Sequence, residues 1–163
     1  MDTLINILVV DDNSENLKVV STFLKEKGYQ IALALDGPSA LKVLAGTRID
    51  LILLDIMMPG MDGFEVCVKI KEDKEIRDIP IIFLTAKSET DDIVKGLQLG
   101  GVDYITKPFR KEELYARINN HVQLKLARDL LKKYAEEYKG SRNSMMSMIM
   151  ELSKIIENKN KKA

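Results

Sequence analysis

The sequence predicts a doubly wound α/β fold, in which helices cover both faces of a parallel sheet. Three short apolar runs, at residues 7–10, 51–54 and 81–84, lack the alternation of polar and apolar residues that marks a strand with one wet face. Segments with apolar residues at helical spacing lie between them. Weaker strand patterns at residues 30–35 and 102–106 complete five strands that alternate with five helices up to about residue 120.

Residues that begin and end helices support these elements. Ser14 is a candidate cap for a first helix that stops before Gly28, and Pro38 suits the first turn of the second helix. Asp62 is a candidate cap for the third helix. The fifth helix is expected to start near Lys111 and to continue well beyond residue 120, because no stop signal follows until residue 140.

Length and composition exclude several classes of protein. The chain has 163 residues, of which 45% are hydrophobic, enough for one ordinary domain and an appendage but not for two full domains. No apolar run approaches the roughly 18 to 20 residues of a membrane span, and no signal peptide pattern opens the chain. A lone Cys67 and a lone His121 offer neither a disulfide nor a histidine-built metal site. We therefore expect a cytoplasmic protein that does not associate with a membrane.

Charge divides the chain into an acidic and a basic part. Residues 1–120 carry 15 Lys and Arg against 20 Asp and Glu, a net charge of −5, whereas residues 121–163 carry 10 against 5, a net charge of +5. A basic tail suits nucleic acid or anionic lipid, but scattered charges more often mark a solvated helix face. The tail is also too short for a winged-helix domain, so direct DNA binding is not expected.

The tail has the apolar spacing of an interacting helix. The spacing alternates between three and four residues, as in a coiled coil, at Leu124, Ala127, Leu131, Tyr134 and Tyr138. A break at residues 139–141 precedes a second apolar stripe, formed by Met145, Ile149, Leu152 and Ile156. The first stripe can meet its copy in a second chain, fold back on the α/β domain, or pair with the second stripe. We expect a homodimer through the tail, with a fold-back hairpin as a nearly equal alternative.

Polar residues follow four of the five predicted strands. Asp11 and Asp12 follow the first strand, and the third ends in Asp55. Thr85 ends the fourth strand, and Lys107 follows the fifth. In an open parallel sheet these positions meet at one edge, where ligands bind. Three converging carboxylates would repel one another unless a cation lies between them, and Mg²⁺ suits oxygen ligands. Together with a hydroxyl and a lysine, they form a set of groups suited to phosphoryl transfer.

Four stretches of the sequence occur in an order and at intervals that identify a family. They are residues 7–12 (ILVVDD), 53–63 (LLDIMMPGMDG), 83–86 (FLTA) and 103–109 (DYITKPF). In these motifs the chain resembles the receiver domain of two-component response regulators, over about residues 4–122. The resemblance implies a flavodoxin-like sheet with strand order 2-1-3-4-5. It also implies a division into a receiver domain, residues 1–122, and a helical extension, residues 123–163.

The resemblance implies a role for each residue at the strand ends. Asp55 would accept a phosphoryl group from a histidine kinase or phosphotransfer protein. Asp11, Asp12, Asp55 and the backbone carbonyl of Met57 would hold Mg²⁺. Lys107 would pair with the phosphoryl oxygens, and the peptide bond from Lys107 to Pro108 would be cis.

A switch is implied as well. The Thr85 hydroxyl would move to bond the phosphoryl group, and the ring of Tyr104 would fill the space left behind. One departure from the family's pattern is Gly101-Val102, where an Ala and a polar residue are more common.

Three functions remain open at this stage. The first is a phosphorylation-dependent signalling module that is not itself an enzyme, apart from its own phosphotransfer and autodephosphorylation. The second is the front part of a longer regulator with an enzymatic output domain. The third is an aspartate-nucleophile phosphatase, which is disfavoured because such enzymes typically place a second Asp two residues beyond the nucleophile, where this chain has Met57.

Overall fold

The computed structural model describes residues 4–86, 90–137 and 142–161. The chain divides into two compact units, Met1–Ile118 and Asn119–Ala163, and the boundary falls inside helix α5. The elements follow in the order β1 (Asn6–Val10), α1 (Ser14–Glu26), β2 (Gln30–Ala34), α2 (Gly37–Gly46), β3 (Leu51–Asp55), α3 (Gly63–Glu72), β4 (Ile81–Thr85), α4 (Thr90–Gln98), β5 (Asp103–Thr106), α5 (Lys111–Glu137) and α6 (Arg142–Lys161).

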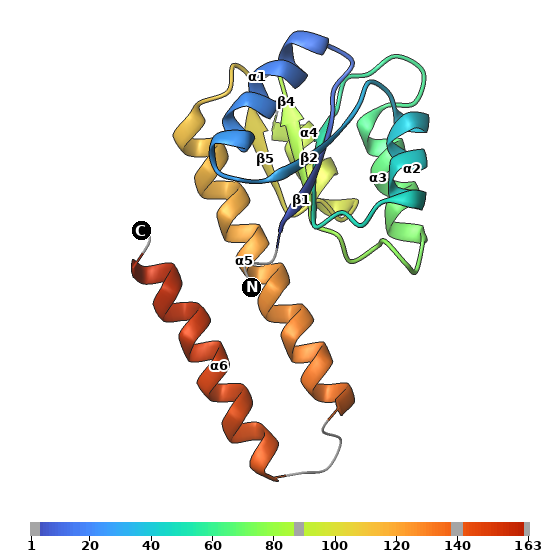
Figure 1. The fold of residues 1–163 in the computed structure, drawn as a ribbon. Helices are drawn as coiled ribbons and strands as arrows, with labels where there is room; N and C mark the ends of the chain where they lie inside the picture. Colours follow the sequence, from blue (N-terminus) through green and yellow to red (C-terminus); the bar gives the residue numbers. More distant parts are fainter. Residues whose placement is uncertain (1–3, 87–89, 138–141, 162–163) are drawn as a thin grey trace. The chain divides into compact units, whose positions relative to one another are not determined.

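The first unit is built on a five-stranded sheet in the order β2-β1-β3-β4-β5, and every pair of neighbouring strands is parallel. Helices lie on both faces of the sheet, with α2 and α3 side by side on one of them and α1 on the other (Figure 1). The first part of α5 lies beside α1, and the two helices are joined by a hydrogen bond from the Tyr115 hydroxyl to the carbonyl oxygen of Phe23 at 2.7 Å. The predicted doubly wound fold and its strand order are thus confirmed.

The central strands explain the unbroken apolar runs of the sequence. Every residue of β3 and β4 is buried, since helices cover both faces of the sheet there. The Phe83 ring of β4 packs against Phe64 of α3, with ring centroids 5.6 Å apart. It also accounts for Gly101, because a Cβ at that position would lie only 2.5 Å from the Phe83 ring. The departure from the family's usual Ala is therefore a consequence of core packing.

Capping residues fix the start of the helices that follow the functional strands. The first helix is capped by Asn13 and not by the predicted Ser14, because the Asn13 side chain accepts hydrogen bonds from the backbone of Glu15 and Asn16. Asp62 caps α3 as predicted, in a reciprocal capping box with Glu65. Ser14 is then the first residue of α1, one position later than the cap.

Gly63 allows α3 to begin close to the end of β3. Its N–H donates to the carbonyl oxygen of Ile56 at 2.9 Å. A Cβ at this position would lie 2.1 Å from the carbonyl oxygen of Asp55, which is far inside van der Waals contact. Only glycine fits here, and it allows the loop that follows Asp55 to return to the end of β3.

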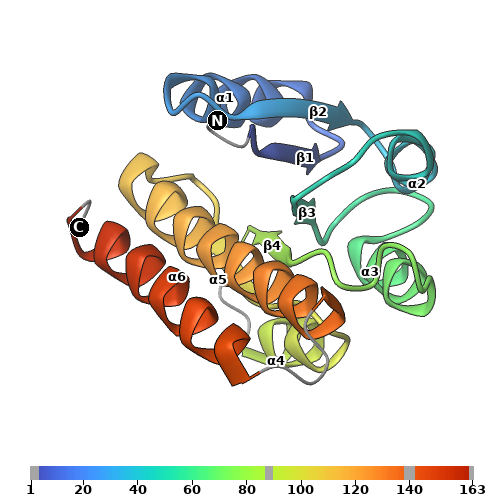
Figure 2. The same cartoon turned by 60° about the horizontal axis from the view of Figure 1, so that its bottom comes forward.

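The second unit contains the last part of α5 and the helix α6. The two helices run side by side in opposite directions (Figures 1 and 2). The Tyr134 hydroxyl of α5 donates to the carboxylate of Glu151 in α6 at 2.7 Å. This pairing is the fold-back hairpin. The predicted break at residues 139–141 lies outside the described residues. No helix in the described ranges is long and apolar enough to cross a membrane.

The first apolar stripe predicted from the sequence, called the seam of α5 from here on, does not face a single direction in the structure. Ala127 and Tyr134 are half-buried, whereas Leu124 and Leu131 are 60% and 40% exposed. The fifth position of the seam, Tyr138, lies outside the described residues. The spacing of three and four residues therefore does not form a single buried row within this chain.

Candidate functional site

The strand-end residues of the sequence motifs meet at the carboxyl edge of the sheet. Asp11 follows β1 and Asp55 ends β3, and both are buried, whereas the neighbouring Asp12 is exposed. One carboxylate oxygen from each of the three lies within 4.8 Å of the others. Because β1 and β3 are adjacent and parallel, their carboxyl ends lie next to each other. The sheet order therefore brings together carboxylates that are far apart in the sequence.

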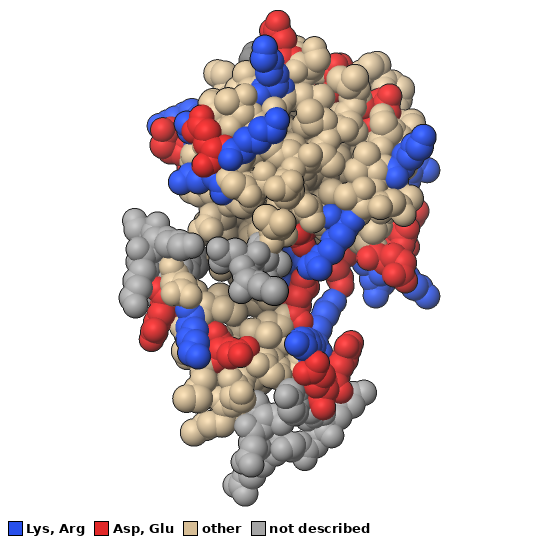
Figure 3. All heavy atoms as spheres, viewed as in Figure 1, with Lys and Arg blue, Asp and Glu red and all other residues tan. Residues whose placement is uncertain are grey.

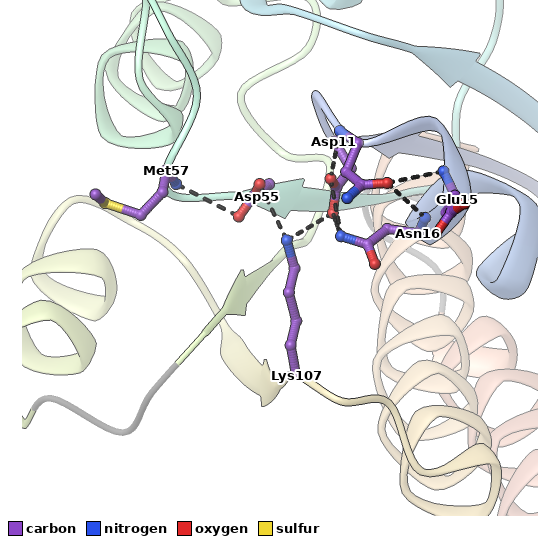
Figure 4. A network of polar contacts seen from close by, with 7 residues as sticks. Asp11, Glu15, Asn16, Asp55, Met57 and Lys107 are labelled. Carbon is purple, nitrogen blue, oxygen red and sulfur yellow. Dashed lines mark hydrogen bonds and ion pairs between the residues drawn. The ribbon is translucent and has the colours of Figure 1, made fainter.

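Lys107 lies between the two buried carboxylates. Its Nζ is 2.7 Å from Asp11 Oδ2 and 3.1 Å from Asp55 Oδ2 (Figure 4). The backbone N–H of Lys107 donates to the carbonyl oxygen of Thr85 at 2.7 Å, and the peptide bond from Lys107 to Pro108 is cis. The end of β4 therefore anchors the segment that directs the lysine into the site.

The pKa values reflect this arrangement of buried charges. Burial raises the pKa of Asp55 to about 6, and the adjacent Lys107 only partly offsets that effect. Burial alone would lower the pKa of the Lys107 ammonium, but the hydrogen bonds and charges of Asp11 and Asp55 outweigh burial and raise it. Lys107 is therefore fully protonated at neutral pH, and Asp55 is a carboxylate held in an unfavourable environment.

Two asparagines orient Asp11, and the sequence motifs did not single them out. The Asn16 amide nitrogen lies 3.2 Å from each of the two carboxylate oxygens of Asp11. The backbone N–H of Asn13 donates to Asp11 Oδ1 at 2.9 Å. Figure 4 shows Asn16 on one side of Asp11 and Lys107 on the other. Only the position of Asn16 in the first turn of the helix that follows β1 could have identified it.

The remaining predicted residues lie around this centre. The backbone N–H of Met57 lies 3.4 Å from Asp55 Oδ1, and its side chain is 71% exposed. Thr85 is buried at the end of β4, next to the strand that carries Asp55. Tyr104 in β5 is half-buried, and the Arg117 guanidinium lies over its ring at 5.3 Å from the centroid.

The donor set fits a hard divalent cation. The three Asp side chains offer only oxygen atoms, and the close approach of buried carboxylates is stabilised when a cation shares them. No histidine or cysteine belongs to this cluster, which disfavours the softer transition metals. The cluster could therefore hold a metal ion of the Mg²⁺ type.

Stability should depend on pH through Asp55. Its pKa is raised to about 6 in the folded protein, above the ordinary value of 3.8, so the folded state binds the proton more tightly. Stability without metal is then expected to fall as the pH rises through this range, by about 1–3 kcal/mol. Urea unfolding in a chelator at a series of pH values would measure the loss, and Asp55→Asn should lack it. A parent and variant with equal pH profiles would contradict the expectation.

Asn16 should matter for metal affinity. Asn16→Ala removes the two amide contacts to Asp11 and leaves the backbone and Lys107 contacts in place, so Mg²⁺ affinity is expected to fall about 10-fold. Calorimetric titration with Mg²⁺ would measure it. Asn13→Ser keeps a capping side chain and the backbone contact to Asp11, so this control should bind Mg²⁺ like the parent. Unchanged affinity in Asn16→Ala would remove Asn16 from the site.

Comparison with known proteins identifies the first unit. Residues 7–119 match the model of the response regulator receiver domain. The chain belongs to this family. Response regulator PleD from Caulobacter vibrioides is 43% identical over 126 residues, which are 77% of this chain and 28% of PleD. A probable cyclic di-GMP phosphodiesterase from Vibrio cholerae is 44% identical over 125 residues, again 77% of this chain and 28% of that protein.

A solved structure agrees with the sheet topology of the receiver. The chemotaxis response regulator CheY4 of Vibrio cholerae superposes with a TM-score of 0.70 and 30% sequence identity, and the match covers 73% of this chain and 99% of CheY4. The chain thus spans the whole of a single receiver but little more than a quarter of the length of the two curated relatives.

Proposed function

We propose that this chain is a phosphorylation-activated response regulator that takes a phosphoryl group on Asp55 from a histidine kinase or phosphotransfer protein. The observation that carries the proposal is the convergence of Asp11, Asp12, Asp55 and Lys107 at the carboxyl edge of a receiver sheet. Asp55 is ionised at neutral pH and is therefore a nucleophile. Mg²⁺ held by the three carboxylates and the Met57 carbonyl oxygen would neutralise the phosphoryl charge.

The chain's own residues account for the transfer. An Asp55 carboxylate oxygen forms the new bond to phosphorus while the bond from phosphorus to the kinase histidine nitrogen breaks, and that nitrogen keeps the electron pair. Lys107 already contacts Asp55 Oδ2 at 3.1 Å, so its ammonium is placed to pair with the phosphoryl oxygens that arrive there. Asn16 and the Asn13 backbone keep Asp11 oriented throughout.

A phosphodonor experiment separates this function from the phosphatase alternative. The full chain is incubated with acetyl phosphate and Mg²⁺, and phosphate release and protein mass are followed together. A receiver gives one labile phosphoryl group per chain and slow release, because the acyl phosphate is the product of the reaction. Fast multiple turnover without a phosphorylated protein would favour the aspartate-nucleophile phosphatase and overturn the proposal.

The second candidate function is the receiver part of a longer regulator with an enzymatic output domain. It is favoured by the relatives, since the chain matches only 28% of a Vibrio cholerae protein named as a probable cyclic di-GMP phosphodiesterase. In this role the domain remains the phosphoacceptor, and another part of the protein catalyses the output reaction. The full reading frame of the gene would decide between the two.

We further propose that the protein is cytoplasmic and that its second unit forms a homodimer and acts through protein contacts. Two helices of similar length make up the described part of this unit, and they pair by the contact of Tyr134 with Glu151. Such a hairpin offers long helical faces to another protein. Phosphorylation at Asp55 would then change the assembly or partner binding of the chain, through Thr85 and Tyr104 as the switch.

A further inference from the structure

The two faces of the helical hairpin in the second unit differ in chemistry. On one face of α5, ion pairs at a spacing of four residues join Lys125 to Asp129 and Lys133 to Glu137. Figure 3 shows Lys, Arg, Asp and Glu side chains over both helices on the face turned toward the viewer. The side chains of Asp129, Lys133 and Glu137 on this face are 41%, 65% and 48% exposed, which is typical of a surface that remains in water.

The α6 helix has more apolar surface than α5 covers. Met148, Leu152 and Ile155 are half-buried at a spacing of four and three residues, so they form the row that faces α5. A second row, Met145, Ile149 and Ile156, is 61%, 51% and 59% exposed, respectively. At 3.6 residues per turn the second row lies about a quarter turn from the first.

The α5 helix repeats this arrangement. Its half-buried row contains Ala127, Leu130 and Tyr134, and the exposed Leu124 and Leu131 lie about a quarter turn away in the same rotational sense as in α6. In both helices the exposed row is reached from the half-buried row by the same rotation about the helix axis, viewed from the N-terminus to the C-terminus. Because the two helices are antiparallel, both exposed rows then lie on the same side of the pair. The exposed rows of α5 and α6 therefore form one apolar face of the hairpin, opposite the ion pairs.

Two charged residues beside the apolar face indicate which molecule binds to it. Arg128 lies six residues before Tyr134, and Glu157 lies six residues after Glu151. Since Tyr134 contacts Glu151, antiparallel helices place Arg128 and Glu157 at the same level along the hairpin. Both residues are exposed and lie outside the apolar row, Arg128 beside it on α5 and Glu157 on the outer side of α6.

A second copy satisfies these features. Two hairpins can pack with their apolar faces together and be related by a two-fold axis that runs parallel to the helices. In that arrangement α5 of one copy lies against α6 of the other. Arg128 then meets the oppositely charged Glu157 of the second copy at the rim, and the reciprocal pair forms at the other rim. The apolar rows of the two copies bury each other over the length of the helices.

We propose that the apolar face formed by Leu124, Leu131, Met145, Ile149 and Ile156 binds the same face of a second copy, giving a four-helix bundle in which the two hairpins point in the same direction. The inference rests on the homodimer proposed above and assigns its surface. The sequence left a hairpin and a dimer open as alternatives. In this proposal both occur, because each chain forms a hairpin and two hairpins form the dimer.

A pair of neighbouring substitutions tests the face. Ile149→Glu places a charge in the proposed interface, whereas Met150→Glu places the same charge one residue later, at a side chain that is 64% exposed on another side of α6. In sedimentation equilibrium of the full chain, Ile149→Glu should raise the dimer dissociation constant at least about 30-fold. Met150→Glu should change it less than about threefold. Equal effects of the two variants, or a parent that stays monomeric with acetyl phosphate and Mg²⁺, would overturn the proposal.

A charge-reversal cycle tests the parallel arrangement. Arg128→Glu and Glu157→Arg should each weaken the dimer about three- to tenfold, because each breaks two rim ion pairs and places like charges together. The double variant should return to within about twofold of the parent. A double variant as weak as the singles would overturn the parallel arrangement. Acetyl phosphate labelling of every variant should equal that of the parent, so a failed dimer is distinguishable from a failed phosphoacceptor.

Discussion

An Asp55→Asn protein is expected to take up no phosphoryl group from acetyl phosphate in the presence of Mg²⁺. Asparagine keeps the size of the side chain in its buried position, but its amide has no anionic oxygen to attack phosphorus and offers one metal ligand fewer. We expect at least about a 1,000-fold loss of labelling rate, as for removal of a nucleophile. Mass spectrometry of the intact protein would measure it, followed by peptide mapping.

The matched control for this variant is Asp62→Asn. Asp62 lies in the loop after β3 but caps α3, and asparagine is an equally good cap, so the fold and labelling should be unchanged. Labelling should also disappear from the parent when a chelator removes the divalent cation, since Lys107 alone leaves two buried carboxylates near the incoming phosphoryl group. Persistent labelling of Asp55→Asn at another residue would refute Asp55 as the phosphoacceptor.

Most of the first unit could be predicted from the sequence because its signals are strong and local. The strand at residues 51–54 consists only of branched apolar residues, and the structure buries it on both faces. The strand-end rule then brings Asp11, Asp55 and Lys107 to one edge without any knowledge of their contacts. Topology thus converts distant sequence motifs into one cluster.

Other features depend on tertiary contacts that leave no pattern in the sequence. Asn16 is an ordinary residue for the first turn of a helix, and only the position of Asp11 gives it a role. Gly101 is explained by the Phe83 ring, 18 residues earlier in the chain. The cap at Asn13 was predicted one residue late, because Asn and Ser are both good caps and the sequence alone does not choose between neighbours.

The seam of α5 illustrates a different limit. A spacing of three and four residues predicts an apolar row but not the direction it faces or the number of partners it meets. In the structure Tyr134 contacts Glu151 of α6 and Ala127 is half-buried on the same side of α5, whereas Leu124 and Leu131 are exposed. The second apolar stripe suggested that a hairpin could form, but three of its four residues, Met145, Ile149 and Ile156, are exposed, and only Leu152 lies in the half-buried row. Spacing alone therefore predicted neither the row of α6 that pairs with α5 nor the division of the seam between two faces.

Thr85→Ala should separate phosphorylation from its consequences. Thr85 is buried at the end of β4, and its carbonyl oxygen accepts the hydrogen bond from the backbone of Lys107. Alanine keeps this backbone contact and removes only the hydroxyl and a methyl group. The site at Asp55 therefore stays assembled, and we expect the variant to accept a phosphoryl group within about threefold of the parent rate.

The switch itself should be largely lost in this variant. A phosphoryl group shifts a two-state equilibrium only through contacts that differ between the states, and the proposed contact of this kind is the Thr85 hydroxyl. We expect phosphorylated Thr85→Ala to lose most of the phosphorylation-dependent change in sedimentation and in pull-down assays with a phosphotransfer partner.

The register of the sheet supplies a control for this prediction. Thr106 in β5 is paired with Thr85 and is half-buried, so Thr106→Ala removes the same groups from the neighbouring strand and should respond like the parent. Tyr104→Ala should uncouple more weakly, because the lost ring leaves a packing defect and removes the partner of Arg117 in both states. If phosphorylated Thr85→Ala matched the phosphorylated parent in both assays, Thr85 would be a structural hydroxyl and the switch would have to lie elsewhere around Asp55.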